Sequence, residues 1–148
     1  MLMTKTTCAL IVCAAFATGL AARGLFSPAV TVHAAANRVF EIRTYTAAPG
    51  KLEALKSRFR DHTVKLFEKH GMKNIGYWVP QDAPLKDNTL IYVVAHESRE
   101  AATKSWAGFR ADPDWTKARA ESEKDGPLTA QGGVTSVFAD PTDFSAIK

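Results

Sequence analysis

The sequence predicts an α+β domain in which a four-stranded antiparallel sheet carries helices on one face. Three observations support this prediction. Four short segments have the alternating or continuous apolar pattern of strands, and two regions between them have apolar residues at helical spacing. The elements follow the order strand, helix, strand, strand, helix pair, strand, which is the order of a ferredoxin-like unit. A chain of 148 residues has room for one such domain.

The first strand is predicted from Val39 to Thr46, where side chains alternate between two faces. One face would carry Phe40, Ile42 and Thr44, and the other would carry Glu41, Arg43 and Tyr45. We expect the polar face to close against a second subunit. There it either forms interfacial ion pairs and hydrogen bonds or lines a polar cavity in which Arg43 binds an anionic group. Glu41 and Arg43, about 7 Å apart on one face, are within reach of each other.

A long helix is predicted after the Ala48–Gly50 turn, ending at Gly71. Positions 52, 55, 59, 62 and 66 fall at helical spacing and form the stripe that packs on the sheet. All of them are apolar except His62, which is therefore expected to be buried.

Two roles are open for His62. A buried imidazole needs a hydrogen-bond partner, so His62 is either a structural residue bonded to protein or a ligand-facing residue in a pocket between helix and sheet. In the second case it is an axial haem ligand or an acid/base group. A zinc site requires three or four ligands, so no metal ion is expected. His70, beside Gly71, is interpreted as a structural residue of the last helical turn.

The second strand is predicted over Asn74–Val79 and the third over Thr89–His96, with the loop Pro80–Asp87 between them. The third strand is almost continuously apolar, so it is expected at the centre of the sheet. Tyr92 and His96 share one of its faces.

Two helices and a last strand complete the domain. Ser98 is predicted as the N-cap of a helix whose inner face carries Ala102, Ser105, Trp106 and Phe109. Asp112 and Pro113 begin a second, highly charged helix that ends at Gly126. The last strand is predicted over Gly132–Phe138.

Aromatic side chains give a further set of candidates. Trp78, Trp106 and Trp115 either wall an aromatic pocket or act as core and interface anchors. No Gly-rich phosphate loop, Ser–His–acid set or paired-carboxylate pattern is found, so no catalytic residue is assigned. The candidates for a ligand pocket are His62, Glu41, Arg43, Tyr45, Trp78, Tyr92, His96 and Trp106.

The N-terminal segment, residues 1–36, is predicted to be a signal peptide, which leaves residues 37–148 as the domain. Lys5 precedes an apolar run from Cys8 to Ala22, and Ala34–Ala36 supplies a cleavage site. The protein would then be exported, to the periplasm or beyond. An uncleaved membrane anchor extending past Arg23 is the alternative.

Cleavage changes what the composition implies. It takes two of the 19 basic residues and none of the 15 acidic ones, so the net charge falls from +4 to +2. The remaining charges are interspersed, which argues against nucleic acid as a partner. Both cysteines lie in the segment, so the mature domain has no disulfide and no thiol nucleophile.

Three stretches, FEIRTYTAAPGKLE, LFEKHGM and GYW, resemble the NIPSNAP family, and the resemblance continues to Val137. It implies a ferredoxin-like unit that pairs into a dimeric α/β barrel, and hence a homodimer. It does not imply an established activity. The same fold occurs in haem-degrading and cofactor-free monooxygenases, but chemistry carried over from a fold alone is analogy.

Three functions are compatible with these features. The first is an exported homodimeric module that binds a small molecule or a partner without chemistry or cofactor of its own. The second is a monooxygenase-like enzyme, cofactor-free or haem-linked, with a helix–sheet pocket around His62. The third is a structural or partner-binding protein of the cell envelope. The lack of mature cysteines and of a catalytic set favours the first function.

Overall fold

Residues 38–148 are described by the computed structural model; the predictions for the signal peptide lie outside them. The strands are β1 (Val39–Ala47), β2 (Lys73–Trp78), β3 (Thr89–His96) and β4 (Thr129–Ala139). The helical segments are α1 (Leu52–Arg58), the π-helix η1 (Phe59–Thr63), α2 (Val64–Lys69), the 3₁₀ turn η2 (Leu85–Asp87), α3 (Arg99–Ala111) and α4 (Pro113–Ser122). Within this range no helix is long and apolar enough to cross a membrane.

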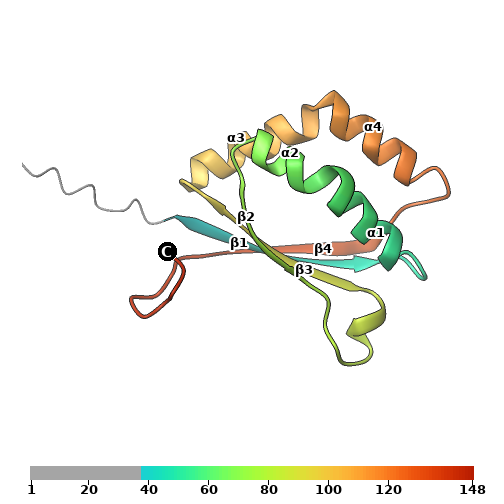
Figure 1. The fold of residues 1–148 in the computed structure, drawn as a ribbon, viewed down its shortest axis with the longest axis horizontal. Helices are drawn as coiled ribbons and strands as arrows, with labels where there is room; N and C mark the ends of the chain where they lie inside the picture. The colour runs from blue at the N-terminus through green and yellow to red at the C-terminus, as the bar shows by residue number, and fades with distance from the viewer. Residues whose placement is uncertain (1–37) are drawn as a thin grey trace, which may run out of the picture. The chain divides into compact units, whose positions relative to one another are not determined.

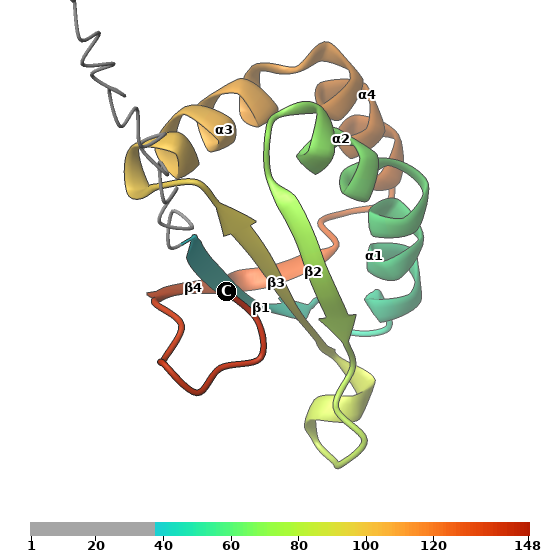
Figure 2. The ribbon, with the colours of Figure 1, turned by 60° about the vertical axis from the view of Figure 1, so that its left-hand side comes forward.

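The four strands form one antiparallel sheet in the order β2-β3-β1-β4. Among residues 38–148 all the long helices lie on one side of the twisted sheet, and none of them covers the other side (Figure 1, Figure 2). The predicted fold class and order of elements are therefore confirmed, with β3 central as expected. The last strand is longer than predicted, and the second helix of the pair ends at Ser122, before Gly126.

The strand register decides which side chains lie under the helices. Arg43 faces Tyr92 on β3 and Ser136 on β4, and all three lie on the helix-covered face. The prediction that Glu41, Arg43 and Tyr45 face a second subunit is therefore wrong. The alternation of residues along β1 assigns the side chains to the two faces of the strand correctly. The polar face can be buried because donors from β3, α3 and β4, as well as Arg43, pair with Glu41.

The core between sheet and helices contains a cluster of aromatic rings. Phe59 packs against Tyr92 and Phe67, with ring centroids 5.1 and 6.2 Å apart, and Phe67 packs against Trp106 and Phe109. Such tilted and edge-to-face contacts add to the free energy gained by burying the rings.

The π-helix η1 changes the face on which His62 lies. The buried side chains along this helix are Leu52, Leu55, Arg58, Phe59, Thr63, Leu66 and Phe67. Thr63 therefore takes the inner position after Phe59, and its hydroxyl donates to the carbonyl of Arg58 at 3.2 Å. Because the wider turn adds one residue, His62 is turned outward and is exposed. The prediction of a buried His62 is wrong.

Two predicted helix starts are confirmed by their caps. The Ser98 hydroxyl accepts from the backbone N–H of Ala101 at 3.1 Å, and Asp112 accepts from the N–H of Asp114 at 2.8 Å. Asp112 also pairs with Lys69 and with His70, whose Nε2 lies 2.7 Å from its Oδ2. The end of α2 is thereby tied to the junction of α3 and α4, which agrees with the structural role expected for His70.

Candidate functional site

The buried carboxylate of Glu41 is the centre of a polar network between sheet and helices. Its Oε1 accepts from Arg43 at 2.5 Å and from the Ser136 hydroxyl at 2.6 Å. Its Oε2 accepts from the indole of Trp106 at 2.6 Å and contacts Nε2 of His96 at 3.0 Å. Because an ionised carboxylate only accepts, the ring proton of His96 lies on Nε2. Four donors from β1, β3, α3 and β4 thus converge on one residue of β1.

These hydrogen bonds fix the charge of the network. Burial alone would raise the pKa of Glu41. The hydrogen bonds from His96, Ser136, Trp106 and Arg43 outweigh this effect and lower the pKa to about 2. Glu41 is therefore ionised at neutral pH and both of its oxygens are occupied. It is a poor general base, and its effect is to position the groups that donate to it.

Arg43 is the cationic member of the network. Its guanidinium carbon lies 4.4 Å from the ring centroid of Trp106 and 5.6 Å from that of Tyr45. One nitrogen donates to Glu41 and another makes a long contact of 3.5 Å with the Tyr45 hydroxyl. Its Nε is buried and has no hydrogen-bond partner within residues 38–148. The guanidinium is thus held in place by Glu41, Trp106 and Tyr45.

Tyr45 adds a second donor beside Arg43. Its hydroxyl oxygen accepts from Tyr92, 3.2 Å away, and from Arg43. Within the described range Tyr45 donates to no acceptor. Burial raises the pKa of Tyr92 well above its ordinary value, so Tyr92 remains a neutral donor. The proton of Tyr45 is consequently available to an incoming oxygen atom.

The network is open to solvent on the side of β4. Ser136 and Val134 lie on the helix-facing side of this edge strand, and both are exposed. The Arg43 side chain is itself 16% exposed, whereas Glu41 is almost fully buried. Arg43 is therefore the more accessible member of this ion pair.

Six of the eight residues proposed from the sequence lie together in this network: Glu41, Arg43, Tyr45, Tyr92, His96 and Trp106. Trp78 does not, because it pairs with Ile91 on the uncovered face of the sheet, where its ring lies over Gly76. The sequence interpretation missed Ser136. Its place in a predicted strand was visible, but the β1–β4 register that brings it to Glu41 was not.

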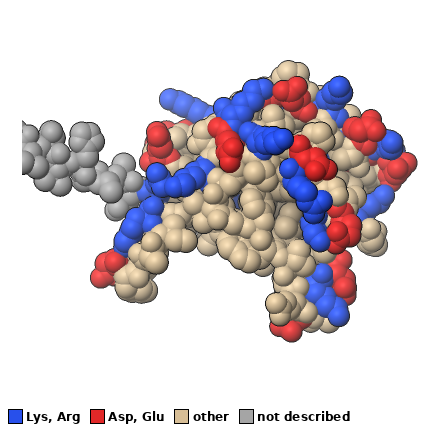
Figure 3. Space-filling model, in the orientation of Figure 1, with Lys and Arg blue, Asp and Glu red and all other residues tan. Residues whose placement is uncertain are grey.

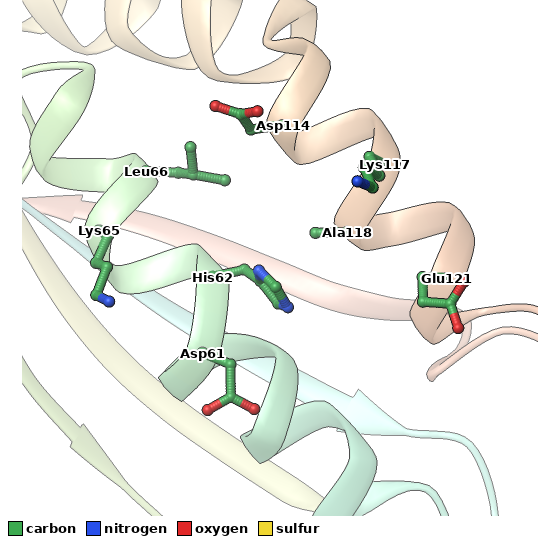
Figure 4. A pocket seen from close by; sticks show the side chains of 8 residues that line it. All are labelled: Asp61, His62, Lys65, Leu66, Asp114, Lys117, Ala118 and Glu121. Carbon is green, nitrogen blue, oxygen red and sulfur yellow. The ribbon is translucent and has the colours of Figure 1, made fainter.

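His62 lies apart from the network, in a groove between the helix η1–α2 and α4 (Figure 4). The groove has a volume of about 450 Å³ and is lined by Asp61, His62, Lys65, Leu66, Asp114, Lys117, Ala118 and Glu121. In Figure 4 the imidazole points from its own helix toward α4. The predicted helix–sheet pocket around His62 is therefore wrong. Among residues 38–148 no group of three or more His, Cys, Asp or Glu side chains is placed to hold a metal ion.

The fold and the network define a class: a ferredoxin-like α+β domain with a buried ionic network between its sheet and its helices. The chain belongs to the NIPSNAP family, whose family model matches residues 40–146. No curated protein matches the chain.

Solved structures support the same assignment of fold. A NIPSNAP family protein of unknown function from Agrobacterium tumefaciens is 22% identical, with 78% of this chain and 98% of that chain covered and a TM-score of 0.65. A second NIPSNAP family protein from that organism is 20% identical over 75% of this chain and 99% of its own, with a TM-score of 0.64. An uncharacterised NIPSNAP-like domain protein from Burkholderia xenovorans is 20% identical over 74% and 90%, with a TM-score of 0.63.

Proposed function

We propose that this protein is a homodimeric small-molecule-binding module, and that Arg43 and Tyr45 anchor an oxygen acceptor of its ligand. The observation that carries the proposal is the state of Arg43. Its guanidinium is fixed by Glu41 and Trp106, and its side chain is still 16% exposed. A donor that is fixed in place and partly exposed binds an acceptor at low entropic cost.

The surroundings of Arg43 indicate the chemistry of the ligand. Glu41 balances the charge of Arg43, so the site suits one carboxylate or carbonyl oxygen better than a multiply charged anion. The rings of Trp106 and Tyr45 flank the guanidinium, which favours a flat apolar group next to that oxygen. A small aromatic carboxylate or ketone combines both features.

Binding without chemistry is the function that this geometry supports best. Glu41 is saturated by donors and has a low pKa, and His96 is buried behind it. His62, the residue on which a monooxygenase-like enzyme would depend, lies in a different part of the molecule.

The uncovered face of the sheet supports the homodimer. Ile42, Trp78 and Val137 are 40%, 52% and 62% exposed. Figure 3 shows a hollow underside, between the loop that carries η2 and the C-terminal segment, largely free of charged residues, whereas charged residues gather over the helices. An apolar face of this kind is expected to be covered by another surface. A second copy, packed sheet to sheet, would cover it.

The proposal includes export after removal of residues 1–36, on the sequence pattern of that segment. N-terminal sequencing of the exported protein should give Asn37 as the first residue. Full-length chain in the membrane fraction would instead show an uncleaved anchor.

Calorimetric titration with benzoate and acetophenone tests the binding site, with benzylamine as a cation of similar size. Benzoate and acetophenone should bind and benzylamine should not. The substitution Arg43→Gln should weaken benzoate binding by about tenfold or more, because a charge-assisted hydrogen bond is lost.

Arg58→Gln provides a matched control. Arg58 is also buried, pairs with Glu123 at 2.7 Å and stacks on Trp115 at 5.1 Å. This variant should lose stability but keep its affinity for benzoate. Equal benzoate affinity in the wild type and Arg43→Gln would refute the proposal, and so would tight binding of benzylamine.

A further inference from the structure

A second cavity lies between the π-helix and β2, at the edge of the sheet. Its volume is about 270 Å³, and its walls are formed by Lys56, Phe59, Arg60, Val64, Tyr77, Trp78, Val79 and Leu90. None of the six residues of the Glu41 network lines it. The cavity is therefore a separate place for a ligand, independent of the proposed function of Arg43.

The π-helix is what brings two of the walls together. Phe59 is its first residue and Val64 follows its last, five positions on. In a regular α-helix two residues five positions apart point about 140° away from each other. The wider π turn reduces this angle, so that both side chains face the cavity. The same distortion that turns His62 outward thus builds one side of this cavity.

The charged residues that line the cavity are all positive. Its lining contains Lys56 and Arg60 but no acidic residue. Lys56 pairs with Glu53 at 2.6 Å, outside the cavity. Arg60 is exposed and takes part in no ion pair and no side-chain hydrogen bond within residues 38–148. A guanidinium at the edge of an apolar cavity is complementary to an anionic head on an apolar body.

We propose that this cavity binds a small amphipathic anion, a carboxylate with a short apolar chain. The chain would lie among Phe59, Tyr77 and Leu90, and the carboxylate would pair with Arg60 at the rim. The remaining wall, Val64 and Val79, closes the cavity around the chain.

Titration of the purified protein with octanoate, and with octan-1-ol as the uncharged probe, tests this site. The methyl NMR signals of Val64, Val79 and Leu90 should shift saturably with octanoate. Arg60→Gln should weaken octanoate binding by about tenfold and leave octan-1-ol unchanged, because only the anion pairs with the guanidinium. Arg110→Gln, an exposed arginine of α3 outside the cavity, is the matched control and should bind like the wild type.

Two further variants separate the possible failures. Val64→Trp should fill the cavity and abolish binding of both probes, whereas Arg43→Gln should leave octanoate binding unchanged. Unaltered octanoate affinity in Arg60→Gln would overturn the proposal, as would methyl shifts absent from the three cavity residues. If Arg43→Gln alone removes octanoate binding, the probe occupies the Glu41 network and the second site does not exist.

Discussion

The indole N–H of Trp106 donates a 2.6 Å hydrogen bond to the buried carboxylate of Glu41, which lies 65 positions earlier in the chain. This bond ties α3 to the central part of the sheet. It also holds the indole where the guanidinium of Arg43 stacks on it. The position of the proposed ligand anchor therefore depends on a carboxylate that does not itself contact solvent.

Loss of that carboxylate should be costly. Glu41→Gln leaves Arg43 without its counter-charge in a buried site, and a lost partner of this kind costs about 3 kcal/mol of unfolding free energy. The double variant Glu41→Gln/Arg43→Gln should lose less than the sum of the two single variants, since the unpaired charge is then absent. Urea unfolding of the three variants measures this. Strict additivity would mean that the two side chains are not coupled.

The stability of the protein should fall in acid through Glu41. Its pKa is about 2 in the folded protein against an ordinary value of 4.5, so the unfolded chain binds the proton more readily. The stabilisation is fully present above pH 4.5 and is lost as the pH falls toward 2. It amounts to roughly 3 kcal/mol. The difference in unfolding free energy between wild type and Glu41→Gln should therefore shrink between pH 5 and pH 2; a constant difference would contradict this assignment.

Substitution of His62 should cost less stability than substitution of Thr63, because Thr63 is buried and His62 is exposed, the reverse of what the helical spacing predicts. His62→Ala, an exposed substitution, should change the unfolding free energy by less than about 0.5 kcal/mol. Thr63→Ala removes a buried side chain and its bond to the Arg58 carbonyl, and should cost about 1–2 kcal/mol. Denaturant midpoints of the two variants decide the matter. A larger loss of stability for His62→Ala than for Thr63→Ala would contradict the π turn and support a regular helix with His62 buried.

The fold could be read from the sequence because its signals are local. The continuous apolar run Thr89–His96 matches β3, and Ser98 and Asp112 are side-chain caps that need only neighbouring residues. These features, with the order of the elements, were sufficient for the fold class.

The errors arose where a position depends on distant contacts or on one extra backbone residue. The spacing through His62 fits a regular helix equally well, and the π turn is shown by the backbone hydrogen bond from the Val64 N–H to the Phe59 carbonyl, five residues earlier. Likewise, the polar face of β1 is buried because Trp106 and Ser136, far along the chain, supply donors to Glu41. No local pattern records that pairing.

The proposed homodimer should depend on the uncovered face of the sheet. Light scattering of the purified protein should give twice the chain mass. Val137→Lys places a charge on the face that a second copy would cover, and should shift the protein toward monomer. Lys104→Glu, on the exposed side of α3, is the control and should remain dimeric. A wild-type protein that is monomeric at micromolar concentration would refute the proposed homodimer.

The Nε–H of Arg43 offers the most direct test of the central claim, that this guanidinium anchors the ligand. Its NMR signal can be assigned by its disappearance in Arg43→Lys, and the Nε–H of Arg58, which likewise lacks a partner within residues 38–148, serves as an internal reference. During a benzoate titration the Arg43 signal should shift saturably, with the dissociation constant found by calorimetry, while the Arg58 signal stays in place. An Arg43 signal that does not move while benzoate binding saturates would contradict the account.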